Sequence, residues 1–111
     1  MNSYFENYFQ KLSKLTSDIK TKKLIEVAEL ISSKNLNGKK IIIAGNGGSA
    51  SIASHISVDF IKSAKIRCLN FNEPNLITCF SNDFGYENWI KEALNIYASA
   101  NDIIILISSS G

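Results

Sequence analysis

The chain has 111 residues, which is enough for one domain and lies near the lower end of what forms a robust core. Its composition, 45% hydrophobic and 20% charged with a single proline, is that of a folded globular protein and excludes a disordered chain. The net charge of +2 is too small to indicate a nucleic acid or a membrane surface as a partner.

Nothing in the sequence predicts export or membrane insertion. The N-terminus lacks the charged segment and apolar run of a signal peptide, and no apolar stretch approaches the roughly 18 residues of a membrane span. Cys68 and Cys79 lie in apolar segments without C-x-x-C spacing. We therefore expect a soluble, cytoplasmic protein with two buried, reduced thiols.

Two amphipathic helices are predicted at the N-terminus, over residues 2–17 and from residue 20 to about residue 33. The first begins with a capping-box pattern at Ser3 and Glu6. Its apolar residues recur at helical spacing: Phe5, Tyr8, Phe9, Leu12 and Leu15. Such a face either packs on its own domain or forms a subunit interface, and the sequence leaves both open.

Beyond these helices, strands alternate with helices. The expected strands are 41–44, 65–71 and 103–107, and the expected helices are 49–63, 74–80 and 86–99, with a polar break at 81–85. This order predicts a parallel, doubly wound α/β sheet with right-handed crossovers. We divide the chain into N-terminal helices (1–37) for packing or oligomerisation and an α/β part (38–111).

The last predicted strand, 103–107, is the most apolar stretch of the chain. It is therefore expected in the centre of the sheet. A strand of this kind at the C-terminal end needs neighbours and a helix behind it, and Ser-Ser-Ser-Gly resembles the start of another turn. We therefore expect the chain to be the N-terminal part of a longer protein.

A glycine-rich turn, Gly45-Asn46-Gly47-Gly48, joins the first strand to a helix for which Ser49 or Ser51 is the expected N-cap. Backbone N–H groups and the positive end of a helix dipole meet there, which favours a bound anion, usually phosphate. Ligands bind beyond the carboxyl ends of parallel strands, so the loop Ser108-Ser109-Ser110 should lie beside this turn. We predict a phosphate cradle formed by Ser49 and the three serines. The alternative is two ordinary glycine- and serine-rich turns.

The same turn also fits G-x-G-x-x-G/A, the pattern of a dinucleotide site. Such a site needs an acidic residue at the end of the second strand, and Glu73 lies beyond that point, directly before Pro74. The serine loop has no role in such a site, and no Gly-Lys-Ser/Thr follows the turn, which excludes a Walker A loop. A dinucleotide-binding Rossmann protein is kept as a minor alternative, and no nucleotide cofactor is expected.

Three motifs together resemble the sugar isomerase (SIS) domain family. They are GNGGSA with His55 further along the same helix, SNDFG at 81–85, and an apolar strand ending in SSSG. Within that family they look most like phosphoheptose isomerases, which convert sedoheptulose 7-phosphate to a heptopyranose phosphate for surface-polysaccharide precursors. The resemblance implies a flavodoxin-like three-layer αβα fold, a phosphorylated sugar as ligand, and a homotetramer.

The resemblance also implies roles for single residues. Substrate contacts fall on Asn46, Gly47, Gly48, Asn82 and Asp83, and phosphate ligands on Ser108, Ser109 and Ser110. His55 matches a zinc-binding position, and Asp59 matches a glutamate that contacts both metal and substrate. An aspartate is one methylene shorter, so its carboxylate reaches about 1.5 Å less far, which can re-aim or abolish a proton transfer.

Aldose–ketose isomerisation moves a proton between neighbouring carbons through an enediol, and therefore needs a general base and an electrophile at the oxyanion. His55 and Asp59 lie four residues apart on one predicted helix, so they adjoin and can supply two ligands to one zinc ion. The other ligands and the second acid/base would lie after Gly111. We expect an isomerase that uses Asp59 and His55. The alternative is a non-catalytic SIS module, a phosphosugar sensor or protein-binding domain, in which both residues are solvated surface groups.

Overall fold

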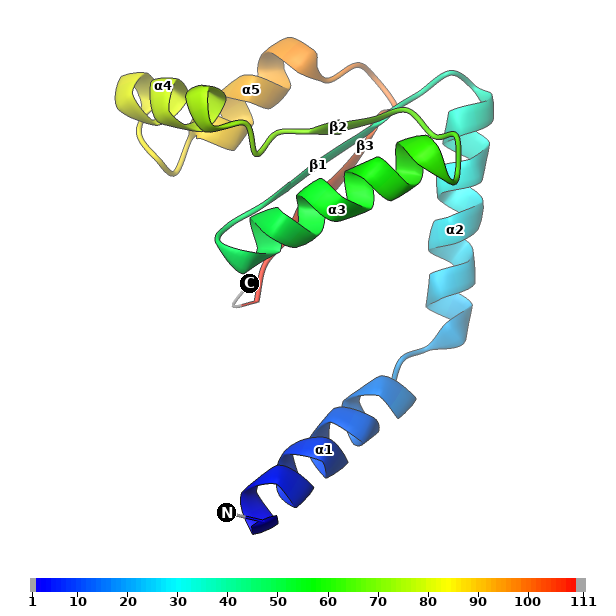
Figure 1. The fold of residues 1–111 in the computed structure, drawn as a ribbon. Helices are drawn as coiled ribbons and strands as arrows, with labels where there is room; N and C mark the ends of the chain where they lie inside the picture. The colour runs from blue at the N-terminus through cyan, green and yellow to red at the C-terminus, as the bar shows by residue number, and fades with distance from the viewer. Residues whose placement is uncertain (1, 110–111) are drawn as a thin grey trace. The chain divides into compact units, whose positions relative to one another are not determined.

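The computed structural model describes residues 2–109, which divide into two compact units between Leu30 and Ile31. The first unit contains helix α1 (Asn2–Ser17) and most of helix α2 (Thr21–Leu36). The second contains the end of α2, all three strands and three further helices (Figure 1). The division of the chain at residue 37 by role stays a prediction.

The two N-terminal helices form where the sequence predicts them, but the second is longer. Helix α1 has the predicted bounds, whereas α2 continues to Leu36, past the predicted end near residue 33. Helix α2 is terminated at Gly38, which has a φ of +71°, a backbone angle that favours glycine. The N–H of the next residue, Lys39, donates a hydrogen bond to the Lys34 carbonyl oxygen at 3.0 Å. A left-handed glycine with such a bond is a common helix C-cap, so the helix ends only there.

Three parallel strands form one sheet in the order β2-β1-β3. Their bounds are β1 Ile41–Gly45, β2 Cys68–Asn70 and β3 Ile103–Ile107. The predicted parallel α/β architecture is confirmed. Among the described residues β1 is central and β3 pairs with β1 alone, so the central place predicted for the last strand stays a prediction.

Helices cover both faces of the sheet and bury the first four residues of β1, 41–44. Helix α3 (Gly48–Lys62) packs on the face of Ile41 and Ile43, while helices α4 (Pro74–Phe84) and α5 (Trp89–Tyr97) pack on the opposite face. Figure 1 shows α3 alongside the strands and the α4–α5 pair on the other side. This gives the three layers expected of a doubly wound sheet.

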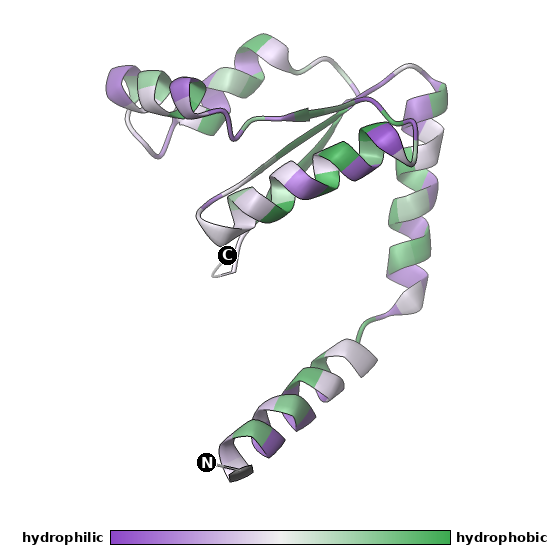
Figure 2. Cartoon of the chain, viewed as in Figure 1, coloured by the Kyte–Doolittle hydropathy of each residue, from purple (hydrophilic) through white to green (hydrophobic). Residues whose placement is uncertain are grey.

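Strand β3 is covered on one face only. Ile103, Ile105 and Ile107 pack into the cluster beneath α3, whereas Ile104 and Leu106 are 45% and 59% exposed. Figure 2 shows β1 and β3 as hydrophobic strands. Apolar content alone therefore did not distinguish a strand covered on both faces from one covered on a single face.

The segment after β2 is more helical than predicted. The polar break expected at 81–85 is wrong: α4 continues through Ser81 and Asp83 to Phe84 and ends at Gly85, which has a φ of +86°. Short polar residues are acceptable at a helix end, and the true terminator is the glycine. At the other end, the Glu73 carboxylate accepts a hydrogen bond from the Leu76 N–H at 2.8 Å and caps α4.

The two cysteines differ in environment. Cys68 is buried in β2 as predicted, but Cys79 lies on the exposed side of α4, so the prediction that both thiols are buried is wrong. Within residues 2–109, none of the helices combines the length and the apolar character needed to cross a bilayer.

Candidate functional site

The turn after β1 requires glycine at its first position. A Cβ placed on Gly45 would lie 2.4 Å from the carbonyl oxygen of Ser49, closer than any real contact. The strand therefore passes directly against the first turn of α3, and only a residue without a side chain permits that approach. This fixes the carboxyl end of β1 against the helix N-terminus.

Helix α3 begins earlier than predicted and is capped by glycine. Its N-cap is Gly47, with a φ of +55°, and no side chain caps the helix. The prediction of Ser49 or Ser51 as the N-cap is wrong, because the left-handed Gly47 brings the chain into the helix one residue sooner. The Ser49 and Ala50 N–H groups donate to the carbonyl oxygens of Asn46 and Gly47, both at 3.0 Å, so the turn itself uses these two donors.

The Asn72 carboxamide holds the end of β1. Its Oδ1 accepts from the Gly45 N–H at 2.9 Å, and its Nδ2 donates to the Gly45 carbonyl oxygen at 2.6 Å. A second amide supports it, because the Asn72 N–H donates to Asn70 Oδ1 and Asn70 Nδ2 donates to Ser54 Oγ. This chain of hydrogen bonds connects the turn to β2 and α3.

A pocket of about 520 Å³ lies at the carboxyl ends of β1 and β3. Asn46 and Ser108 both line it, because Gly45 pairs with Ile107 and the residue after each strand emerges at the same edge. Tyr86 and Trp89 line it from the α5 side, and the Tyr86 hydroxyl donates to Asn46 Oδ1 at 2.9 Å. This is the position at which open parallel sheets bind ligands.

The predicted site residues are only partly gathered here. Asn46 and Ser108 share the pocket, the turn residues Gly47, Gly48 and Ser49 follow Asn46 directly, and Ser109 follows Ser108. Ser110 lies outside the described residues. Asn82 and Asp83 lie on the last turn of α4, joined by a hydrogen bond of 2.9 Å, and neither side chain lines the pocket.

His55 and Asp59 lie elsewhere on α3, on its solvent-facing side. Their side chains are 82% and 59% exposed, and His55 Nε2 is 3.5 Å from Asp59 Oδ2. Helix α3 covers the face of the sheet opposite to α4 and α5, and neither residue lines the pocket that contains Asn46.

The donor types of this pair suit zinc, since imidazole nitrogen and carboxylate oxygen are both common ligands. Among residues 2–109, however, no group of three or more His, Cys, Asp or Glu side chains can hold a metal ion. A zinc ion held by this pair would need further ligands.

Burial and hydrogen bonding set the ionisation of three other groups. Burial raises the pKa of the Cys68 thiol to about 11, so this thiol stays protonated and unreactive. The Leu76 and Asn75 backbone N–H groups lower the pKa of Glu73, whose carboxylate is occupied in capping α4. This disfavours Glu73 as a ribose ligand, and with it the dinucleotide alternative.

Asp102 is the third group. Burial alone would raise its pKa, but hydrogen bonds from the Lys40 side chain, the Ser99 N–H and the Lys40 N–H, with the Lys40 charge, lower it to about 2. The two side chains are nearly enclosed, with Lys40 15% and Asp102 3% exposed. They join the start of β1 to the turn before β3.

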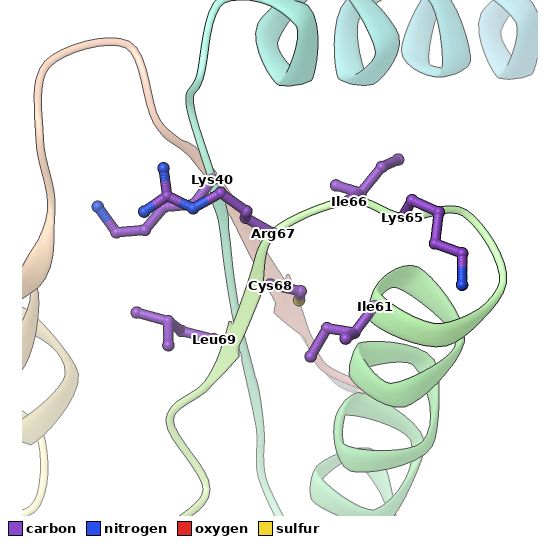
Figure 3. A pocket seen from close by; sticks show the side chains of 7 residues that line it. All are labelled: Lys40, Ile61, Lys65, Ile66, Arg67, Cys68 and Leu69. Atoms are coloured by element: carbon purple, nitrogen blue, oxygen red, sulfur yellow. The ribbon is translucent and has the colours of Figure 1, made fainter.

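A second pocket, also of about 520 Å³, lies at the amino ends of the strands. In Figure 3, Lys40 and Arg67 extend to one side of it, with the buried Cys68 between β2 and α3. Both cations are engaged, Lys40 by Asp102 and Arg67 by the Gly38 carbonyl oxygen at 3.0 Å. Parallel sheets seldom bind ligands at this end, so the carboxyl-end pocket is the candidate site.

This fold and site define the class of protein: the chain belongs to the SIS domain family, which matches residues 3–111. The resemblance seen in the sequence is thus confirmed. Among its relatives, the phosphoheptose isomerase of Fusobacterium nucleatum is 30% identical over 98% of this chain and 59% of its own length. That of Aneurinibacillus thermoaerophilus is 31% identical over the whole chain and 62% of its own length.

Solved structures share the fold. Phosphoheptose isomerases from Neisseria gonorrhoeae and Francisella tularensis both superpose with a TM-score of 0.83, covering 96% of this chain and 58% and 59% of theirs. Their sequence identities of 21% and 23% support the shared fold alone. The chain spans about half to three fifths of the length of the relatives it matches.

Sequence reasoning placed Asn72 at the carboxyl edge of the sheet but gave it no role, and it did not find Tyr86. Asn72 follows the second strand at the carboxyl edge of the sheet, a place where polar residues meet ligands or each other. Tyr86 directly follows the SNDFG motif. Both positions can be recognised in the sequence. However, only the folded chain shows that both side chains contact the end of β1 and the turn that follows it.

Proposed function

We propose that the chain carries the phosphosugar site of an isomerase of the phosphoheptose isomerase type. The reaction would convert sedoheptulose 7-phosphate, a ketose, to a heptopyranose 7-phosphate, an aldose, in the cytoplasm, and would feed the synthesis of surface-polysaccharide heptose. One observation carries the proposal: Asn46 and Ser108, which follow β1 and β3, line a single pocket at the carboxyl edge of the sheet. The names of the relatives support the substrate class.

In this proposal the small polar residues around the pocket bind the substrate. Hydroxyl and amide groups donate to phosphate oxygens without filling the space by bulk. The phosphate and sugar ligands are Asn46, Gly47, Gly48, Ser49, Ser108, Ser109 and Ser110. Asn82 and Asp83 contact the sugar when the substrate extends toward the end of α4.

His55 and Asp59 are proposed as the acid–base pair and as two ligands of a zinc ion. Zinc, when bound, supplies a Lewis acid that polarises the sugar carbonyl. The Asp59 carboxylate takes and returns the proton that moves between the neighbouring carbons, and His55 holds that carboxylate in place at 3.5 Å. Since both side chains are largely exposed, the remaining groups of this centre come from residues that pack against the outer side of α3.

Self-association through α1 completes the proposal. Its large apolar side chains are all about half exposed or more, including Phe5 at 51%, Phe9 at 60% and Leu15 at 59%. Apolar helical faces of this size are usually covered by protein. We propose a homo-oligomer, a tetramer by resemblance, in which α1 of one copy packs on another copy.

A non-catalytic phosphosugar sensor is the second candidate. It is favoured by the position of Asp59, which is exposed on the outer side of α3 and does not line the pocket that contains Asn46. A sensor would need the phosphate contacts alone, and in this proposal those contacts come from residues at the carboxyl edge of the sheet.

One experiment separates the two. Sedoheptulose 7-phosphate is incubated, with and without zinc, with the complete natural protein that contains this chain, and the ketose and aldose signals are followed by NMR. An isomerase converts the ketose. A protein that shows no conversion but gains thermal stability from the sugar phosphate is a sensor, and one that shows neither effect contradicts both candidates.

A further inference from the structure

The segment after α4 reaches back to the turn after β1 through a side-chain hydrogen bond. The Tyr86 hydroxyl donates to Asn46 Oδ1 at 2.9 Å, although the two residues are 40 positions apart in the chain. Both line the pocket at the carboxyl ends of β1 and β3. The hydrogen bond therefore lies at the rim of the candidate site and connects two of its walls.

Hydrogen bonds hold the backbone in place around both residues of this contact. Asn46 follows Gly45, which Asn72 holds through two hydrogen bonds, and the Asn46 carbonyl oxygen accepts from the Ser49 N–H. On the other side, the Asn88 N–H donates to the Gly85 carbonyl oxygen at 3.0 Å, which closes a tight turn around Tyr86. Two fixed backbones allow one short hydrogen bond to set the orientation of a side chain.

The orientation matters because a carboxamide has two chemically different ends. Its oxygen accepts hydrogen bonds and its nitrogen donates two, and rotation by half a turn exchanges them. Since the Tyr86 hydroxyl donates to Oδ1, the Nδ2 donors of Asn46 are directed away from Tyr86. In a pocket for an oxygen-rich ligand, this presents donors to the acceptor oxygens of that ligand.

We propose that Tyr86 is a positioning residue that holds the Asn46 carboxamide with its N–H groups toward the phosphosugar. The proposal rests on the proposed function for the identity of the ligand. Tyr86 contributes little to the core, because it is 56% exposed while the neighbouring Trp89 is 4% exposed and provides the packing. Its hydroxyl is therefore the informative group, and Tyr86→Phe removes that group alone.

The test measures the affinity of the complete natural protein that contains this chain for sedoheptulose 7-phosphate and for inorganic phosphate by calorimetry. Loss of one neutral hydrogen bond predicts that Tyr86→Phe weakens sugar-phosphate binding about 2- to 12-fold. Tyr97→Phe, which removes a hydroxyl from α5 but keeps the ring that packs on Phe71, is the matched control and leaves affinity unchanged. In an Asn46→Ala background, Tyr86→Phe has no further effect, because its target is gone.

Unchanged affinity in Tyr86→Phe overturns the proposal, and so does an effect that persists in the Asn46→Ala background, because Tyr86 would then act on the ligand directly. A second measurement does not depend on the ligand. In the ¹⁵N-labelled chain, the side-chain NH₂ resonances of Asn46 should shift toward those of a mobile amide in Tyr86→Phe and stay in place in Tyr97→Phe. If the complete wild-type protein binds neither probe, the proposed function fails, and this NMR comparison still decides whether Tyr86 positions Asn46.

Discussion

Asn72 acts as the pairing partner of Gly45 at a point where the neighbouring strand has already ended. The paired register of β1 with β2 stops at Ile43 and Asn70, and one more backbone bond follows, from the Phe71 N–H to the Ile43 carbonyl oxygen. Two residues further along β1, the Asn72 side chain bonds both backbone groups of Gly45. A side chain thus completes the ladder that the short strand leaves unfinished, and the turn at Asn46 starts from a fixed position.

Replacing this carboxamide should loosen the turn. In Asn72→Ala the Gly45 N–H and carbonyl groups lose their partners in a partly buried place, and we expect unfolding by urea to show a loss of about 1–3 kcal/mol. Asn95→Ala on the exposed side of α5 is the control and should change stability by less than about 0.5 kcal/mol. Equal stability of the two variants would show that the Asn72 bonds add nothing.

Two glycines of the turn should respond differently to the same change. A Cβ on Gly45 meets the Ser49 backbone at 2.4 Å, whereas a Cβ on Gly48 meets nothing within 4 Å. Gly45→Ala should therefore cost about 1–3 kcal/mol or more by overpacking. Gly48→Ala should fold as well as the wild type, because alanine favours the first turn of α3. Thermal denaturation of both variants tests the difference, and equal melting temperatures would contradict the close approach at Gly45.

A charge at Gly48 tests the phosphate cradle without harming the fold. An aspartate at the N-terminus of α3 suits the helix dipole, so Gly48→Asp should stay folded. Its carboxylate repels a bound phosphate, and we expect sugar-phosphate affinity to fall at least about tenfold, with Ser109→Ala weakening it less. Gly48→Asn has the same shape without the charge and should bind nearly as well as the wild type. Calorimetry that finds Gly48→Asp and Gly48→Asn equal would place the phosphate elsewhere.

Acid should destabilise the fold through Asp102. Its pKa is about 2 in the folded chain and 3.8 is its ordinary value, so the ionised carboxylate stabilises the fold above about pH 4. That contribution is lost as the pH falls from about 4 to about 2. Asp102→Asn breaks the enclosed pair with Lys40 and should cost about 3 kcal/mol at pH 7.

The pH dependence distinguishes this pair from a general acid effect. Unfolding free energy measured between pH 2 and pH 5 should vary less in Asp102→Asn than in the wild type. Asp18→Asn, which changes an exposed carboxylate, should keep the wild-type slope. A wild-type slope in Asp102→Asn would mean that other carboxylates carry the acid sensitivity.

Self-association of the protein through α1 can be tested by placing a charged residue on the apolar face of this helix. Leu12 is 47% exposed, and Leu12→Glu should lower the mass found by analytical ultracentrifugation if copies meet on this face. A buried unpaired carboxylate in an interface is strongly unfavourable. Lys11→Glu changes the charge one position earlier on the helix and should leave the mass unchanged. A monomeric wild type would overturn the proposed oligomer.

The sequence predicted the parts of the fold that depend on local pattern. The continuous apolar run at Ile41 and the glycines after it were enough for a buried strand, a tight turn and a helix, and β1 and α3 form there. The parallel order of the strands followed from alternation with helices. The predicted N-cap, Ser49 or Ser51, was wrong by two or four positions, because the backbone angles of Gly47 decide where α3 begins.

Features that depend on the spatial neighbours of a helix or strand could not be predicted from the sequence. Strand β3 is more apolar than β1, but the contacts within residues 2–109 show that β1 is covered on both faces and β3 on one. The site shows the same limit. Asn46 was identified from its motif, whereas its partner Tyr86 is 40 positions away and no spacing rule connects them.

Strand β3 also determines how the isolated chain should behave in the test tube. Within residues 2–109 it is an edge strand of five consecutive aliphatic residues without a charge or a proline, and Leu106 on its open face is 59% exposed. Strands of this kind pair with copies of themselves and grow into fibrils, which charged or proline residues normally prevent. The working concentration of this chain is therefore expected to be limited by aggregation at Ile103–Ile107, and a lysine in place of Leu106 is the first change to try for a soluble sample.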